Sequence, residues 1–342
     1  MAQRSSRLPS LTARPEYGIF LALLVMVAIV AALNPKAFFQ SYSLNLWLFS
    51  LSLYGILAIG EMLVVLTGGI DLSPGSLIAL TGVLSALAVK ALVAAGVGPA
   101  PAVALSVAGT LAAGALIGLG HAFYINRLGV PPFIITLGTL IIARGVAELI
   151  TRGSTISGLP EEFNAIGANG SAHVPGLPFL PVAGVIFAVI AVAAHVLAQR
   201  TWLGRQIYAV GGNAEAARLS GVNVEGVRAF CYAASAAAAS LAGILYASSV
   251  TIGDPKAGLA YELTAIAAVV IGGTSLMGGV GTVPGTVLGA AIMSLLPLGL
   301  TYIRVEAWWQ SISTGAVVVL AVTVDSLRRR RRERASGRNK RG

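Results

Sequence analysis

The sequence predicts an all-α, polytopic membrane protein, and three observations lead there. Of 342 residues, 56% are hydrophobic and only 11% are charged, and the mean hydropathy is +0.84. A soluble protein of this length needs a more polar surface. The apolar residues also fall in runs of about 20, the length that crosses a bilayer as a helix, whereas a membrane β-barrel shows short alternating segments.

The candidate spans follow these runs in order. The first run is followed by Asn-Pro-Lys and not by a small-residue cleavage site, so we expect it to be retained as a span. Two Gly/Pro-rich joints, 67–75 and 272–285, are candidate positions for broken helices. The candidate spans, about ten transmembrane helices in all, are 17–33, 45–66, 75–95, 101–124, 131–150, 179–198, 227–250, 260–276, 282–300 and 307–326.

Positive charge predicts that both termini are cytoplasmic. With the N-terminus inside, seventeen Lys and Arg fall in cytoplasmic segments and five in outside segments, as the positive-inside rule favours. The predicted parts are a cytoplasmic N-terminal segment (1–16), a transmembrane domain (17–327) and a basic cytoplasmic tail (328–342). The transmembrane domain includes an external loop (151–178) and a cytoplasmic loop (199–226).

The basic tail accounts for much of the positive charge. Nine of the 23 Lys and Arg lie in it, beginning with the arginine run 328–332. Such a run beside a final span is typical of an orientation signal and of contact with anionic lipid. We therefore expect membrane lipid, and not nucleic acid, as the partner of this segment. The single cysteine, Cys231, lies in an apolar stretch and is expected to pack there.

The sequence lacks the residue patterns of a catalytic centre. The three histidines are scattered without metal-ligand spacing, and no Gly-x-Ser-x-Gly motif occurs. The dipeptide Gly-Lys is also absent, and with it the phosphate-binding loop that ATPases use. We therefore expect no enzyme, no metal and no cofactor in this chain, so that any ATP must be bound by another chain.

A polar stretch, GGNAEAARLSGVN at 211–223, interrupts the apolar sequence. Asn213 suits a helix N-cap and Gly221 the position after a helix, which predicts about two helical turns between them. Glu215 near the start and Arg218 near the end match the helix dipole. A helix this short is unstable alone, so the flanking spans, a partner protein or both must brace it.

Glycines at four-residue spacing, in 114–118 and 281–289, indicate close helix packing. In addition, 66–80 and 276–290 align without gaps, with Pro74 and Pro284 each at a predicted helix start. A parallel repeat and a chance similarity between two Gly-rich joints are both open interpretations.

Three polar residues at plausible membrane depth are candidates for a translocation path: Asn45, Glu61 and Asp71. Asp71 stands just before a predicted helix N-terminus, where the dipole stabilises a carboxylate, so a capping role and a path role are both open. Few other ionisable residues lie within spans, which disfavours an ion-coupled carrier, since such carriers usually need ionisable groups at mid-membrane.

Four separated motifs carry a resemblance to a known family, in the family's order and from residue 45 onward. They are LTGGIDLSPGSLIALTG (66–82), GRQIYAVGGNAEAARLSGVNV (204–224), YELTAIAAVVIGGTSLMGGVGTVPGTVLGA (261–290) and WWQSISTGAVVVLAVTVDSL (308–327). The chain resembles the integral-membrane permease of bacterial sugar ABC importers, of the ribose, xylose and galactose type. Pro74, Thr264, Val280 and the stretch 295–300 depart from the common family pattern.

This resemblance implies a transport function in the bacterial cytoplasmic membrane. A permease homodimer would import a sugar or related polyol, with two copies of a cytoplasmic ABC ATPase and a periplasmic or lipid-anchored sugar-binding protein as partners. An ion-coupled secondary transporter of a small polar solute is the alternative. The resemblance makes the segment 204–224 the coupling loop to the ATPase, with glycines as hinges. The residues that it assigns to this contact are Gly211, Gly212, Asn213, Glu215, Ala216, Ala217, Arg218, Leu219, Ser220 and Gly221.

Overall fold

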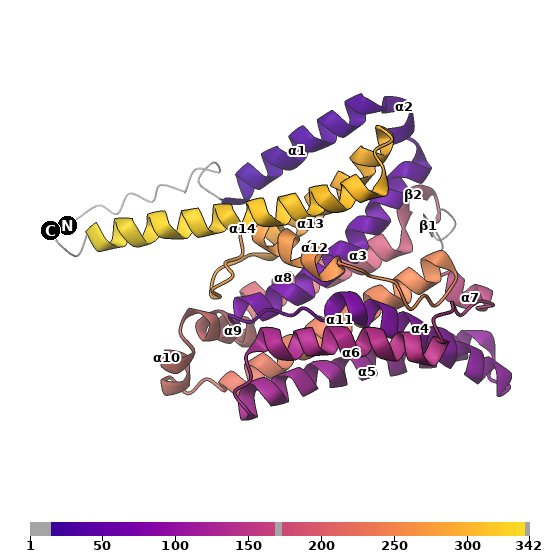
Figure 1. Ribbon diagram of the computed structural model, residues 1–342, viewed down its shortest axis with the longest axis horizontal. Coiled ribbons are helices and arrows are strands. Elements are labelled where there is room, and N and C mark those ends of the chain that lie inside the picture. Colours follow the sequence, from indigo (N-terminus) through magenta and orange to yellow (C-terminus); the bar gives the residue numbers. More distant parts are fainter. Residues whose placement is uncertain (1–14, 168–172, 339–342) are drawn as a thin grey trace.

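A computed structural model describes residues 15–167 and 173–338, and these residues form a bundle of long helices with one small hairpin (Figure 1). Residues 1–14 and 339–342, parts of the predicted N-terminal segment and tail, lie outside the described residues. The elements are α1 (Pro15–Leu33), α2 (Pro35–Phe38), α3 (Ser41–Leu66), α4 (Pro74–Ala94), α5 (Pro99–Arg127), α6 (Pro132–Thr151), α7 (Glu161–Asn164), β1 (His173–Val174), β2 (Leu177–Pro181), α8 (Val182–Arg200), α9 (Trp202–Gly212), α10 (Ala214–Leu219), α11 (Val224–Val250), α12 (Tyr261–Ile271), α13 (Val283–Tyr302) and α14 (Ala307–Arg338).

Eight of the described helices are long and apolar enough to cross a membrane, which confirms the all-α, polytopic class. Proline stands at the first or second position of α2, α4, α5, α6 and α13, where its missing N–H leaves no helical hydrogen bond unmade. Glycines with positive φ follow α4, α10 and α12 (Gly96, Gly221 and Gly273). These local signals explain why the limits of eight of the ten predicted spans agree with the helices to within a few residues.

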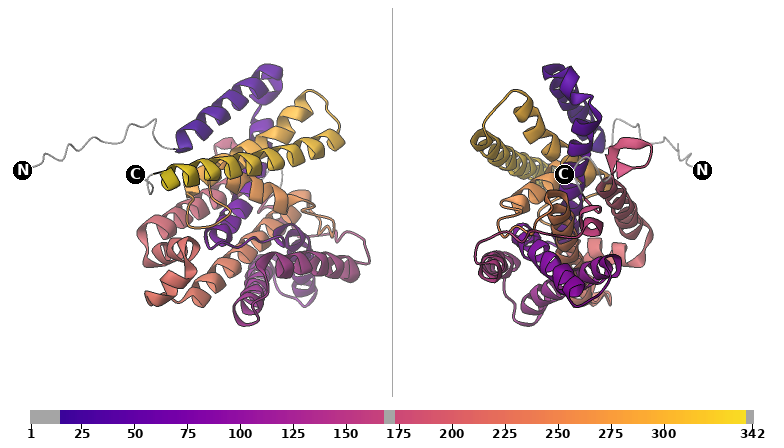
Figure 2. Two further views of the ribbon diagram at one scale, coloured as in Figure 1. Left: turned by 60° about the vertical axis from the view of Figure 1, so that its left-hand side comes forward. Right: turned by 90° about the vertical axis from the view of Figure 1, so that its right-hand side faces the viewer.

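The helices α3 and α11 form the centre of the bundle. Most of α3 is buried, and it contacts α8, α11, α12 and α13. In Figure 1, α3 runs between a group formed by α1, α13 and α14 and a group formed by α4, α5, α6 and α11. The two further views show the same central position (Figure 2). Most side chains of α3 and more than half of those of α11 therefore lie in the protein interior.

The predicted span 260–276 is wrong in length, because α12 ends at Ile271. The pair Gly272–Gly273, with φ +86° at Gly273, ends this helix. Its 11 residues extend about 16 Å, roughly half the thickness of a hydrocarbon core. The helix α14 is longer than the predicted span 307–326 and continues to Arg338. Hydropathy alone missed both limits, because it registers neither the break after α12 nor the continuation of α14 through the arginine run.

Two joints interrupt the helices, as the glycines and prolines predicted. We call residues 66–73, from the last residue of α3 to the start of α4, the first joint, and residues 272–282, between α12 and α13, the second joint. The joints contact each other, since the Gly279 N–H donates to the Leu66 carbonyl oxygen at 3.0 Å. The two aligned segments, 66–80 and 276–290, therefore touch at their joints.

The first joint leads into the interior of the bundle. At one end Leu66 lies beside the second joint, and further on the Asp71 carboxylate contacts Ser235, near the middle of α11. A Cβ placed on Gly75, in the first turn of α4, would overlap the Gly258 carbonyl and the Glu262 carboxylate at the start of α12. The N-termini of α4 and α12 therefore meet inside the protein.

The segment predicted as the external loop contains α7 and a two-stranded antiparallel hairpin, β1 and β2, which is a departure from an entirely helical fold. Residues 168–172 of this loop lie outside the described residues. Figure 1 shows α7 and the hairpin at one end of the molecule and α9 and α10 at the other. We call the latter the α10 end. The first described residues of α1 and the last turns of α14 lie toward the α10 end as well.

The four-residue glycine spacing marks close helix contacts. A Cβ on Gly114 or Gly118 of α5 would overlap atoms of α11, and Gly118 lies directly against the Tyr232 carbonyl. Gly285 and Gly289 of α13 lie against Gly272 and the Ala268 carbonyl in the same manner. The prediction that these glycines serve packing is confirmed.

Candidate functional site

The predicted short helix is present as α10, and its caps are those that the sequence predicts. The Asn213 side chain accepts a hydrogen bond from the Ala216 N–H at 2.9 Å. At the other end Gly221 has φ +84°, its N–H donates to Arg218 O at 3.0 Å, and the Val222 N–H donates to Ala217 O at 3.0 Å. This pair of hydrogen bonds is a Schellman motif. Local sequence thus determines where α10 begins and ends.

In α10, Ala217 is buried and Ala214 is half-buried against the core, whereas the other side chains face out. Ala217 is only 5% exposed and belongs to the main hydrophobic core, whereas Leu219 is 82% exposed. Glu215 and Arg218 form an exposed ion pair at 3.8 Å, which contributes little to stability because solvent screens it. Ala217 therefore anchors the helix, while Leu219 and its neighbours leave an exposed outer face.

The helix α9, which carries α10, was not predicted apart from the loop that contains it. The Thr201 side chain caps it by accepting from the Gly204 N–H at 3.0 Å, and Ile207 and Val210 are buried. The spacing of Leu203, Ile207 and Val210 is the signal that predicts this amphipathic helix. Gly211 and Gly212, which the resemblance makes hinges, are the last residues of α9.

The end of α9 lies directly against both joints. A Cβ on Gly211 would overlap the Leu66 carbonyl and the Gly279 N–H, so only glycine permits this approach. The Tyr208 hydroxyl donates to the Gly281 carbonyl oxygen at 2.8 Å. Burial raises the pKa of Tyr208 above its ordinary value, so the phenol stays protonated and remains a donor.

Glu61 and Asp71 come together in the interior. The Asp71 N–H donates to Glu61 Oε1 at 3.2 Å. Asp71 Oδ1 accepts from the N–H and the hydroxyl of Ser73 at 2.9 and 2.6 Å, and Asp71 Oδ2 accepts from the Ser235 hydroxyl at 3.0 Å. Neither carboxylate forms an ion pair with any described residue. This arrangement ties the first joint to α3 and α11.

Two buried polar atoms beside this pair have no hydrogen-bond partner among the described residues. They are Glu61 Oε2 and the Tyr232 hydroxyl oxygen, and Tyr232 lies against Gly69 of the first joint. Unpaired buried polar groups are costly.

Asn45 does not join the other two path candidates. It is 2% exposed, and its side-chain amide donates to the Pro178 carbonyl oxygen in β2 at 3.3 Å. This contact lies in the first turns of α3, whereas Glu61 is near the other end of that helix. Asn45 therefore holds the hairpin against α3.

Arg144 of α6 links the chain segments around the N-termini of α4 and α12, which meet in the interior. Its Nη1 donates to the carbonyl oxygens of Pro255 and Ala257 at 2.8 and 2.7 Å, and its Nη2 donates to the Gly75 carbonyl at 3.4 Å. The sequence shows a charge within a span but no partner for it. The partners are carbonyls of the chain segments around the N-termini of α4 and α12, which only the fold brings together.

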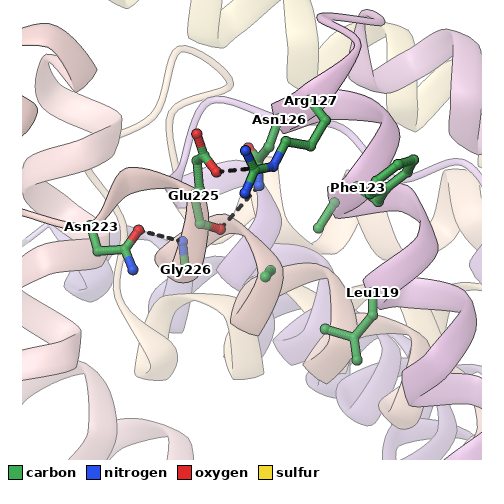
Figure 3. A pocket seen from close by; sticks show the side chains of 9 residues that line it. Leu119, Phe123, Asn126, Arg127, Asn223, Glu225 and Gly226 are labelled. Carbon is green, nitrogen blue, oxygen red and sulfur yellow. Dashed lines mark hydrogen bonds and ion pairs between the residues drawn. The ribbon is translucent and has the colours of Figure 1, made fainter.

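An open pocket of about 310 Å³ lies between the last turns of α5 and the first turns of α11. Figure 3 shows Leu119 and Phe123 on its apolar side and Asn126, Arg127 and Glu225 on its polar side. Arg127 pairs with the Glu225 carboxylate at 3.7 Å, and Asn126 donates to the Glu225 carbonyl at 3.0 Å. These contacts fix the start of α11, directly after α10. The described residues contain no cluster of His, Cys, Asp and Glu that could hold a metal ion.

The chain matches a known protein family and is similar to several transport proteins. Residues 43–322 match the family described as "Branched-chain amino acid transport system / permease component". The chain is 41% identical to the ribose import permease protein RbsC of Escherichia coli (strain K12) over 316 residues, 91% of this chain and 94% of that protein. It is 38% identical to the galactose/methyl galactoside import permease protein MglC of the same organism over 335 residues, 94% and 97% of the two chains. It is 34% identical to its D-allose transport system permease protein AlsC over 312 residues, 91% and 92%.

Proposed function

Because this chain belongs to the family of branched-chain amino acid transport system permease components, we propose that it is the membrane-spanning permease subunit of an ABC importer that moves a monosaccharide. The match covers 280 of 342 residues, 43–322. Three relatives are named for import or transport of ribose, galactose and allose, which supports a monosaccharide or related polyol as the substrate class. The chain acts in the bacterial inner membrane as a multi-pass protein.

The observation that carries ATP coupling is α10 itself. The helix is capped at both ends, anchored by buried Ala217, and presents an exposed outer face with Leu219 at 82% exposure. A rigid element of this kind receives a push and passes it on as a rigid body. In our proposal a separate ABC ATPase binds ATP and contacts this face, and the permease holds no cofactor of its own.

The remaining parts of the proposal concern sidedness and assembly. The α10 end is cytoplasmic, because the start of α1, the last turns of α14 and the Arg-rich loop around α10 share it (Figure 1). Both termini are then cytoplasmic. Ten crossings result if α14 spans and if α12, with the second joint, completes one crossing. A second permease copy and a sugar-binding protein outside the membrane complete the importer.

One observation favours a second candidate, an ion-coupled transporter. Glu61 and Asp71 are both fully buried and hydrogen-bonded to each other through the Asp71 N–H. Buried carboxylates inside a membrane protein often bind protons or cations during transport.

Reconstitution in proteoliposomes separates the two candidates. The permease is reconstituted alone and with its ATPase and binding protein, identified from neighbouring genes, and uptake of radiolabelled ribose, galactose and allose is measured. We expect uptake only with both partners and internal MgATP. Uptake by the permease alone, driven by a proton or sodium gradient, would refute ATP coupling and establish the second candidate.

A further inference from the structure

Three segments that are far apart in the sequence meet at one point of the α10 end. They are the last turn of α9, the first joint and the second joint. The Gly279 N–H donates to the Leu66 carbonyl at 3.0 Å, which joins the two joints. Gly211 packs against both groups of this hydrogen bond, because a Cβ on it would overlap the Leu66 carbonyl and the Gly279 N–H.

A second contact ties α9 to the second joint by different chemistry. The Tyr208 hydroxyl donates to the Gly281 carbonyl at 2.8 Å. Tyr208 and Gly211 lie one helical turn apart and therefore on the same side of α9. The second joint is thus held at two points, one by close backbone packing and one by a directional hydrogen bond.

The helix α10 reaches the bundle mainly through α9. It packs on α9 and on the start of α11. A displacement of α10 is therefore applied to α9, whose last turn lies against both joints. Residues 70–72 and 275–281 of the joints make no α-helical hydrogen bonds, so they are the parts of this region that move at least cost.

The first joint continues from this point to the buried carboxylates. The Thr136 hydroxyl contacts the Ile70 carbonyl at 3.3 Å, the Asp71 N–H contacts Glu61, and the Asp71 carboxylate contacts Ser235. A shift at Leu66 is thus passed within a few residues to α3, α6 and α11. These contacts form a continuous route from α9 to the centre of the bundle.

We propose that Tyr208 and Gly211 are positioning residues that transmit the movement of the coupling helix α10 to both joints, and through the first joint to Glu61 and Asp71. The inference rests on the proposed function, since it requires an ATPase that moves α10. It adds that the force enters the bundle through the junction of Gly211, Leu66 and Gly279. The exposed face of α10 binds the ATPase, whereas this junction couples hydrolysis to transport.

The test uses the complete importer in proteoliposomes and two variants, Gly211→Ala and Tyr208→Phe. Three quantities are measured: co-purification of the ATPase, ATP hydrolysis and sugar transported per ATP hydrolysed. Both variants should retain the ATPase and hydrolyse ATP. Sugar per ATP should fall about tenfold in Gly211→Ala, and about threefold in Tyr208→Phe, which loses one neutral hydrogen bond without adding bulk.

Gly120→Ala is the matched control, because a Cβ there meets nothing within 4 Å. It adds the same methyl group to a helix and should leave the ratio unchanged. Should Gly211→Ala fail to fold, Tyr208→Phe decides the question alone. An unchanged ratio in Tyr208→Phe, or hydrolysis and uptake that fall in proportion, would overturn the inference. If the wild-type protein transports without the ATPase, the proposed function fails instead.

Discussion

The exposed leucine at the end of α10 offers the sharpest test of where the ATPase binds. Leu219 is 82% exposed in the free permease, so most of its apolar surface is available for burial by a partner. Full burial of a leucine side chain contributes about 1.5–3 kcal/mol. Truncation to alanine should therefore weaken ATPase binding by about 1–2 kcal/mol, a rise in Kd of about five- to thirtyfold.

Biolayer interferometry with the permease in nanodiscs and the ATPase in solution measures this Kd directly. The fold should be unaffected, because an exposed side chain contributes little internal packing, and the thermal unfolding temperature of Leu219→Ala should match that of the wild type. Leu149→Ala is the matched control: Leu149 is 77% exposed but lies in the last turn of α6, away from α10. A Kd for Leu219→Ala within twofold of wild type, or an equal weakening in Leu149→Ala, would refute this docking face.

Three further predictions concern stability. Asn213→Ala removes the N-cap of α10 and should destabilise that helix by about 1 kcal/mol. Hydrogen exchange of the amides at 214–220 should therefore accelerate about fivefold. Unchanged exchange would contradict the capping role. Gly118→Val should lower the thermal unfolding temperature because its side chain would overlap the Tyr232 carbonyl, and a thermal-shift assay that finds it as stable as wild type would show that α5 and α11 can separate there. Asp71→Ala leaves the Ser235 hydroxyl without its acceptor and should cost about 1–3 kcal/mol, measured by chemical unfolding in detergent, whereas Ser235→Ala should cost less.

Ala217 illustrates how the structure changes the choice of experiment. The sequence suggests that Ala217→Glu tests docking of the ATPase, because the residue lies in the predicted coupling helix. Its side chain is instead 5% exposed and faces the core. Ala217→Glu would bury a carboxylate and disturb the anchoring of α10, so a loss of uptake in that variant would report on the loop's own packing.

Much of the fold is readable from the sequence because its signals are local. A run of apolar residues, a proline at a helix start and a glycine after a helix end each act within a few residues. The limits of α4 and α6, and the caps of α10 at Asn213 and Gly221, therefore follow from the sequence. The glycines of 114–118 also marked a packed helix face before any neighbour was known.

The depth and partners of each helix were decided only in three dimensions. In a membrane both the core and the lipid-facing surface are apolar, so buried Leu63 and exposed Leu149 are indistinguishable by hydropathy. The sequence also predicted neither that Asn45 holds the hairpin nor that Asp71 meets Ser235, because both contacts join residues far apart in the chain. The contact between Gly211 and Leu66 joins segments far apart in the chain. Such a contact depends on how the helices pack, and no local pattern of residues encodes it.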